Sequence, residues 1–142
     1  MPRDEEVHEP QDSYEAEEWL AKARLDLAAA TRLVSGNPPL TGAAVFHAQQ
    51  AAEKSWKALL AWHASPFPKT HDLRLLGQQL AQHDPGLHEL VLQAANLTQF
   101  AWLFRYPGEP EEPTLGEARA ALDIATQVFE AARLRTKGAL GS

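Results

Sequence analysis

Side chains that could do chemistry are concentrated in three short blocks of the chain. The blocks read FHAQQAAEKSWKALLAW over residues 46–62, PFPKTHDL over residues 66–73 and FRYPG over residues 104–108. Outside these blocks the apolar residues follow the spacing of plain amphipathic helices. The blocks therefore encode either a functional site or only helix packing and helix caps.

The second block offers three ionisable groups within four residues. Lys69 supplies a cation, His71 a group that titrates near neutrality, and Asp72 a carboxylate. The same segment has a structural interpretation, because Thr70 and Asp72 can hydrogen-bond nearby backbone groups and cap the helix that follows. The residues alone leave both interpretations open.

The third block places Arg105 and Tyr106 where a helix should end. A guanidinium at a helix C-terminus complements the helix dipole and the free carbonyl groups. Arginine followed by tyrosine also suits contact with a phosphate and stacking on a base. Here too both interpretations stay open.

The first block is expected to be a helix with a polar side. At 100° per residue, four polar residues lie away from the apolar stripe that contains Trp56: Gln50, Glu53, Lys54 and Lys57. Glu53 and Lys57 are four positions apart and can pair, so the simplest interpretation is a solvated face. However, Phe46 and Trp62 also fall outside the stripe. A helix that is apolar on more than one side suggests a second contact surface, such as a dimer interface.

Several classes of function are disfavoured by what the sequence lacks. The chain contains no cysteine, which excludes disulfides, thiolate zinc sites and a cysteine nucleophile. It contains no glycine-rich phosphate loop and no serine in a nucleophile-elbow context. The histidines that follow the N-terminal segment include no pair spaced three or four residues apart, as one helix face would need to share a metal. We therefore expect neither a metal nor a cofactor.

Length and charge predict one domain with an acidic leader. A chain of 142 residues is long enough to bury roughly two-thirds of its unfolded surface. The net charge of -6 is uneven, because residues 1–18 carry -7 and the remainder carries +1. We expect a disordered leader over residues 1–12, a helical bundle over 13–136 and a C-terminal tail over 137–142. The nearly neutral body offers no broad basic surface for nucleic acid.

No apolar run approaches the roughly 20 residues of a membrane span. The N-terminus MPRDEEVHEP lacks the hydrophobic core of a signal peptide. Together with the absence of cysteine, this predicts a cytoplasmic protein that does not cross a membrane.

The apolar pattern predicts an all-α, antiparallel up-and-down bundle of four long helices and one short helix. The expected helices cover about residues 13–35, 41–64, 73–82, 84–104 and 114–136. Alanine and leucine dominate, which favours helix over strand. Five N-terminal caps are expected, at Asp12 with Glu15, Thr41, Asp72, Asp84, and Thr114 with Glu117.

Taken together, the blocks resemble the HEPN family (higher eukaryotes and prokaryotes nucleotide-binding). The resemblance rests on F-x-x-Q-Q-A-A-E-K-x-x-K-A-L-L, then K-T-H-D-L, then R-Y-P, in this order over about residues 14–136. It implies a cytoplasmic helical bundle that forms a homodimer. Many members of this family are paired with a small nucleotidyltransferase partner in toxin–antitoxin-like modules.

Several HEPN branches are metal-independent ribonucleases defined by R-x4-6-H, with two such motifs meeting across a dimer. Arg105 is the natural candidate for the arginine, but positions 110–112 are Pro110, Glu111 and Glu112. No histidine follows His88. The literal match formed by Arg3 and His8 lies in the acidic leader, outside the resemblance, and we interpret it as chance.

These observations predict a noncatalytic HEPN-type protein that binds a nucleotide, a nucleotidyltransferase partner, or both. The candidate ligand-binding residues are Gln50, Lys54, Lys69, His71, Asp72, Arg105 and Tyr106. One alternative is a ribonuclease with a non-standard site, in which Arg105 and His71 act on RNA. A second alternative is a purely structural dimerisation module, in which the three blocks specify only packing and caps.

Overall fold

The computed structural model describes residues 10–104, 107 and 112–136, and this part of the chain contains helices and no strand. The helices follow the order α1 (Pro10–Ser35), α2 (Thr41–Trp62), α3 (Leu73–His83), η1 (Pro85–Leu87), α4 (His88–Ala94), α5 (Leu97–Leu103) and α6 (Leu115–Arg135). The predicted all-α packed bundle is confirmed. No helix within these described ranges is long and apolar enough to cross a membrane.

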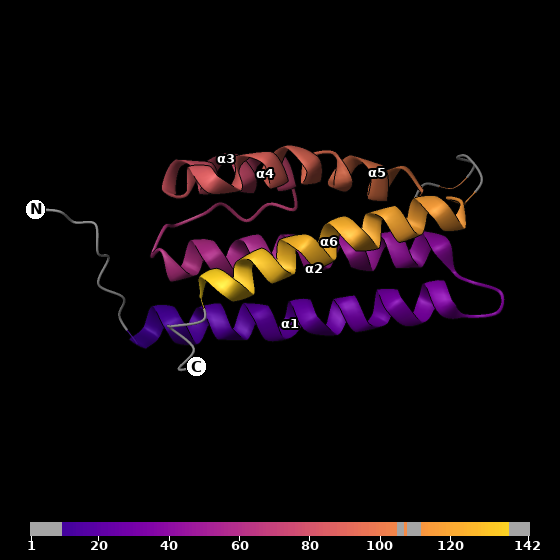
Figure 1. Ribbon diagram of the computed structural model, residues 1–142, viewed down its shortest axis with the longest axis horizontal. Helices are drawn as coiled ribbons and strands as arrows, with labels where there is room; N and C mark the ends of the chain where they lie inside the picture. Colours follow the sequence, from indigo (N-terminus) through magenta and orange to yellow (C-terminus); the bar gives the residue numbers. More distant parts are fainter. Residues whose placement is uncertain (1–9, 105–106, 108–111, 137–142) are drawn as a thin grey trace, which may run out of the picture.

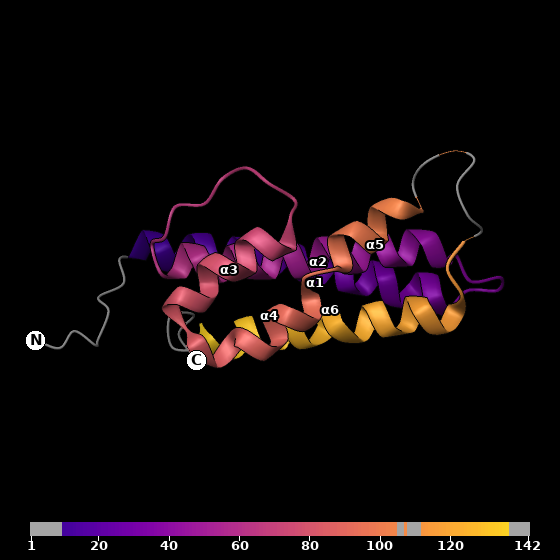
Figure 2. The ribbon, with the colours of Figure 1, turned by 90° about the horizontal axis from the view of Figure 1, so that it is seen from above.

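Helix α2 occupies the centre of the bundle. Helix α1 lies beside it along one edge, α6 crosses α2 and also contacts α1, and α3 to α5 lie on the other side (Figure 1). Seen from above, α3 and α5 lie along α2 whereas α4 lies along α6 (Figure 2). The side chains of Trp56, Leu59 and Leu60 are fully buried. Neighbours within the same chain thus cover the sides of α2 that carry Trp56, Leu59 and Leu60. Phe46 and Trp62, which suggested a second contact surface, are only partly buried, and the dimer contact stays a prediction.

The predicted apolar stripes form the core. In α1 the buried members are Leu20, Ala23, Ala30 and Val34, and Leu27 is partly buried. In α6 all five predicted members are buried: Ala118, Ala121, Ala125, Val128 and Ala132. Because most of the α6 stripe is alanine, this helix can approach α2 closely.

Three of the five predicted caps are confirmed. Asp72 accepts from the backbone N–H of Arg74 at 2.9 Å, and Asp84 accepts from that of Gly86 at 3.0 Å. Thr114 and Glu117 form a reciprocal capping box with distances of 3.0 and 2.9 Å. These caps connect residues two or three positions apart, so a short sequence pattern is sufficient to specify them.

The other two caps were predicted at the wrong positions. Helix α1 begins at Pro10, so Asp12 lies inside its first turn and part of the expected leader is helical. Thr41 is the first residue of α2 and is buried, whereas Leu40 occupies the N-cap position. Helix α2 therefore begins without a side-chain cap, and the N–H of Ala44 bonds to the carbonyl of Leu40.

The helix expected over residues 84–104 is interrupted. Its residues form η1, α4 and α5 in succession, with breaks at Leu87 and at Ala95–Asn96. The side chain of Asn96 accepts a hydrogen bond at 2.8 Å from Arg74, which lies on α3. Asparagine forms such side-chain bonds more readily than it continues a helix. The second break separates α5 from α4 and places Thr98, on α5, against the segment that precedes α3.

Candidate functional site

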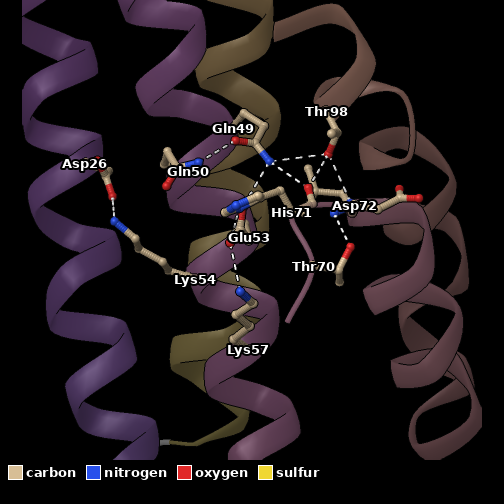
Figure 3. Close-up of polar contacts among 11 residues, drawn as sticks. Asp26, Gln49, Gln50, Glu53, Lys54, Lys57, Thr70, His71, Asp72 and Thr98 are labelled. Carbon is tan, nitrogen blue, oxygen red and sulfur yellow. Dashed lines mark hydrogen bonds and ion pairs between the residues drawn. The ribbon is translucent and has the colours of Figure 1, made fainter. Parts of the chain in front are cut away.

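The centre of the candidate site is the carboxylate of Glu53 on α2, which is only 3% exposed. Lys57 donates to it at 2.9 Å, and Gln49 approaches it at 3.2 Å from one turn earlier. The Nδ1 atom of His71 lies 3.1 Å from both carboxylate oxygens (Figure 3). A buried carboxylate surrounded by donors in this way acts as an acceptor toward each of them.

The expectation of a solvated face for Glu53 and Lys57 is wrong. Both residues are buried, because α1 and the segment between α2 and α3 cover this side of α2. The Lys57 ammonium lies 5.4 Å from the ring centre of Trp19 on α1 and 5.9 Å from that of Phe67 in the connecting segment. The two rings and the Glu53 carboxylate together compensate the ammonium for its loss of water.

His71 is held at its backbone as well as at its ring. Its carbonyl oxygen accepts from the Gln49 amide at 3.0 Å and from the Thr98 hydroxyl at 2.9 Å. The Thr98 oxygen in turn accepts from the backbone N–H of Leu73 at 3.0 Å. Three parts of the chain, namely α2, the start of α3 and α5, are therefore joined at this residue.

These contacts define the proton position on the His71 ring. Because Nδ1 faces a carboxylate that accepts, the proton lies on Nδ1 when the ring is neutral, and Nε2 carries the lone pair. The His71 side chain is 63% exposed even though its Glu53 partner is buried. The imidazole is thus fixed in orientation while most of its surface stays open to a ligand.

An open groove of about 490 Å³ lies beside His71. It is lined by Thr70, His71, Asp72, Arg74, Ala95, Thr98, Gln99 and Trp102. The Trp102 ring centre lies 6.4 Å from that of His71, at an angle of 57°. The groove, called the His71 groove below, combines an indole, an imidazole, a guanidinium and a carboxylate within a small volume.

A second polar cluster connects α1 and α2. Asp26 on α1 is 8% exposed and bonds to Lys54 at 2.6 Å and to Nδ1 of His47 at 2.8 Å. Lys54 therefore extends toward α1 and away from His71 (Figure 3). Lys54 is partly buried because it forms an ion pair with Asp26 across the interface between α1 and α2.

The structure brings some of the predicted site residues together and separates others. Gln50 donates to Gln49 at 2.9 Å and so joins the network around His71, and Asp72 lines the His71 groove while it caps α3. Lys54 belongs to the Asp26 cluster, and Lys69 is exposed and does not line the groove. Arg105 and Tyr106 lie outside the described residues.

The sequence interpretation missed five residues that shape the site: Gln49, Glu53, Arg74, Thr98 and Trp102. The spacing of Gln49 and Glu53, one helical turn apart, was a usable signal that both face the same side. The roles of Arg74, Thr98 and Trp102 depend on the packing of α5 against the start of α3, which no local pattern reveals. Within the described ranges, no group of three or more His, Asp or Glu residues is arranged to hold a metal ion.

Comparison with known protein families agrees with this architecture. A model of the HEPN domain matches residues 16–135, which is most of the chain and includes the QQAAEK and KTHDL segments. The protein therefore belongs to the HEPN family. Searches of curated proteins and of solved structures gave no match.

Proposed function

We propose that this HEPN protein binds a nucleotide in the His71 groove and acts without the usual HEPN ribonuclease chemistry. The observation that carries the proposal is the combination of Trp102, Arg74 and His71 along one groove of about 490 Å³. A nucleotide needs an apolar surface for its base and donors for its phosphate. The groove offers both within reach of one small ligand.

The side chains suggest how such a ligand would lie. The indole of Trp102 offers a stacking surface for a base, a contact worth about 1–3 kcal/mol in single-strand binding proteins. Arg74 already donates to Asn96 at 2.8 Å, and its remaining N–H groups are available to a phosphate oxygen. Asp72 is a fixed negative charge in the same groove, so a monophosphate fits the charge balance better than a triphosphate.

A nucleotidyltransferase partner is the second part of this proposal. HEPN domains often pair with nucleotidyltransferases, and a partner of that class handles the same kind of ligand that the groove suits. We infer that this protein is one half of a toxin–antitoxin-like module. Under this proposal, the nucleotide and the partner protein both bind the face of the protein that contains His71 and Trp102.

Isothermal titration calorimetry with AMP, GMP, ATP and GTP tests the proposal. We expect binding of the monophosphates, a loss of affinity of at least tenfold in Arg74→Ala, and no change in Arg119→Ala, an exposed arginine on α6. A pull-down from the source organism tests for the nucleotidyltransferase. No heat with any nucleotide, together with no retained nucleotidyltransferase, would overturn the proposal.

One observation favours a second candidate, a ribonuclease that uses His71 with Arg105. The Glu53–His71 pair fixes the ring with Nε2 exposed, which is the arrangement a general base requires. This candidate predicts metal-independent RNA cleavage that His71→Ala and Arg105→Ala each abolish. Cleavage that survives both substitutions would exclude it.

A further inference from the structure

The neutral His71 ring is held in one tautomer by its surroundings. Both oxygens of the buried Glu53 carboxylate lie 3.1 Å from Nδ1, and an ionised carboxylate only accepts hydrogen bonds. Moving the proton from Nδ1 to Nε2 would place the Nδ1 lone pair against these two oxygens. Lys57 and Gln49 also approach this carboxylate as donors, so its position is fixed (Figure 3). Nε2 of the neutral ring is therefore an acceptor and not a donor.

The fixed tautomer limits how the ring can contact a phosphate. A phosphate oxygen carries negative charge and accepts hydrogen bonds, so it repels a nitrogen lone pair. Nε2 of His71 gains a hydrogen only when the whole ring becomes a cation. A histidine whose Nδ1 accepted a hydrogen bond would instead donate from Nε2 while neutral. The contact with Glu53 thus couples any phosphate contact at Nε2 to the uptake of one proton.

The charged groups around His71 balance one another while the ring is neutral. Lys57 compensates Glu53 on α2, and the groove itself contains one cation, Arg74, and one anion, Asp72. A phosphate therefore brings negative charge into a site that carries no net charge. A protonated ring supplies the positive charge that matches it.

The other neighbours of the groove do not alter this balance. Lys54 on α2 is paired with Asp26 on α1 at 2.6 Å, so this pair also carries no net charge. Helix α5 contributes Thr98, Gln99 and Trp102 to the groove, none of which ionises. Among the residues that line the groove, the imidazole is consequently the group whose type changes charge near neutral pH.

We propose that His71 binds the phosphate of the ligand as an imidazolium, with Nε2 donating to a phosphate oxygen, so that binding takes up one proton. This inference rests on the nucleotide site proposed above and adds a second phosphate donor beside Arg74. The His71 side chain is 63% exposed, which leaves Nε2 accessible from the groove. Glu53 stabilises the cation, because Nδ1–H then donates between two full charges. Phosphate-bearing ligands should bind more weakly as the pH rises above neutrality, whereas nucleosides should not respond.

Calorimetric titration with AMP in Tris and in HEPES, two buffers of different ionisation enthalpy, measures the proton directly. At about pH 8 free imidazole is mostly neutral, so we expect uptake of about one proton per AMP bound. The affinity for AMP should fall by about tenfold for each pH unit between about pH 7.5 and 8.5. AMP keeps its charge over this range, because the second ionisation of a phosphate monoester lies near about pH 6. Adenosine should bind with an affinity that does not depend on pH.

The variant His71→Gln tests whether this ring takes up the proton. The glutamine amide donates a hydrogen bond without being protonated. The variant should bind AMP about tenfold more weakly near neutral pH and should lose the pH dependence. His88→Gln is the matched control, because His88 is exposed on α4 and does not line the groove, and it should keep the wild-type pH dependence. Circular dichroism checks the fold of both variants, and the proton uptake of the wild-type protein requires no variant.

The possible results separate this inference from the proposed function. AMP binding with no proton uptake and with equal affinity across the pH range would overturn the inference and leave the nucleotide site in place. A pH dependence that persists in His71→Gln would also overturn it, because another group then takes up the proton. No AMP binding at any pH would overturn the proposed nucleotide site, and the inference with it.

Discussion

Glu53 and His71 are separated by eighteen positions in the chain, yet Nδ1 of the histidine lies 3.1 Å from both oxygens of the buried carboxylate. This contact joins the QQAAEK and KTHDL segments, which identify the family, into one hydrogen-bonded unit. Gln49 reinforces the unit by donating to the His71 carbonyl oxygen. The two motifs therefore have a shared structural role, which is to hold the segment before α3 against α2 and to orient His71.

Glu53→Gln should destabilise the protein by about 3–5 kcal/mol, because it leaves the buried Lys57 ammonium without a carboxylate. Urea denaturation measures the change in the free energy of unfolding. The double variant Glu53→Gln/Lys57→Met should recover part of the loss, since it removes the uncompensated charge. A loss below about 1 kcal/mol in the single variant would show that the pair is not buried as described.

Thr98→Val should cost about 1–3 kcal/mol, because it leaves the N–H of Leu73 without an acceptor and removes one donor from the His71 carbonyl oxygen. Hydrogen exchange should also show faster exchange at the start of α3. Thr126→Val is the matched control, since the exposed Thr126 hydroxyl bonds only to the carbonyl of Leu122 in its own helix. The control should change stability by less than about 0.5 kcal/mol.

Substitutions of Asp72 separate its role as a cap from its role in the groove. Asp72→Ala should cost about 1 kcal/mol, whereas Asp72→Asn should preserve stability, because asparagine caps helices as well as aspartate does. Thermal denaturation measures both variants. Asp72→Asn should also tighten binding of phosphate-bearing ligands, because it removes a negative charge from the groove. Unchanged affinity for AMP and ATP in this variant would indicate that the phosphate does not lie near Asp72.

Gly77→Ala should destabilise the protein although alanine is the better helix former. A Cβ atom at Gly77 on α3 would lie 2.7 Å from a methyl group of Val91 on α4, so one of the two helices must shift. Overpacking of this kind costs about 1–3 kcal/mol and exceeds the helix-propensity gain of about 1 kcal/mol. Gly116→Ala on α6 meets nothing closer than 3.9 Å and should be neutral or stabilising. Equal effects in the two variants, measured by urea denaturation, would contradict the close contact between α3 and α4.

Trp102 gives an optical test of the ligand site. Of the four tryptophans in the chain, Trp102 is the one among the residues that line the His71 groove. A nucleotide that stacks on it should quench the intrinsic fluorescence, and Trp102→Phe should abolish the quenching while weakening binding only modestly. Trp19→Phe serves as the control, because Trp19 contacts Phe67 and Lys57 outside the groove. Quenching that persists in Trp102→Phe would place the ligand elsewhere.

Local patterns predicted the parts of this structure that depend on nearby residues. The apolar stripes of α1 and α6 and the caps at Asp72 and Thr114 each involve positions at most one or two turns apart or along one helix. The all-α bundle follows from these stripes, because each helix must cover its apolar side.

The site itself depends on contacts that sequence spacing does not encode. Glu53 and Lys57 have the pattern of an exposed ion pair, and only the covering of α2 by α1 and by the segment with Phe67 buries them. Lys54 was grouped with His71 because both lie in the motifs that carry the resemblance, but Lys54 pairs with Asp26 at the interface between α1 and α2. The break before α5 likewise depends on Arg74, which lies 22 positions before Asn96.

The central position of α2 affects how variation within this family should be interpreted. Because packing constrains nearly every side of this helix, evolution will preserve residues such as Trp56 and Leu60 for folding alone. Invariance along the QQAAEK segment is consequently weak support for any particular activity. The groove side chains, above all the exposed His71 and the partly buried Trp102, contribute little to the core. Their pattern of substitution among relatives is therefore the better indicator of which ligand these proteins bind.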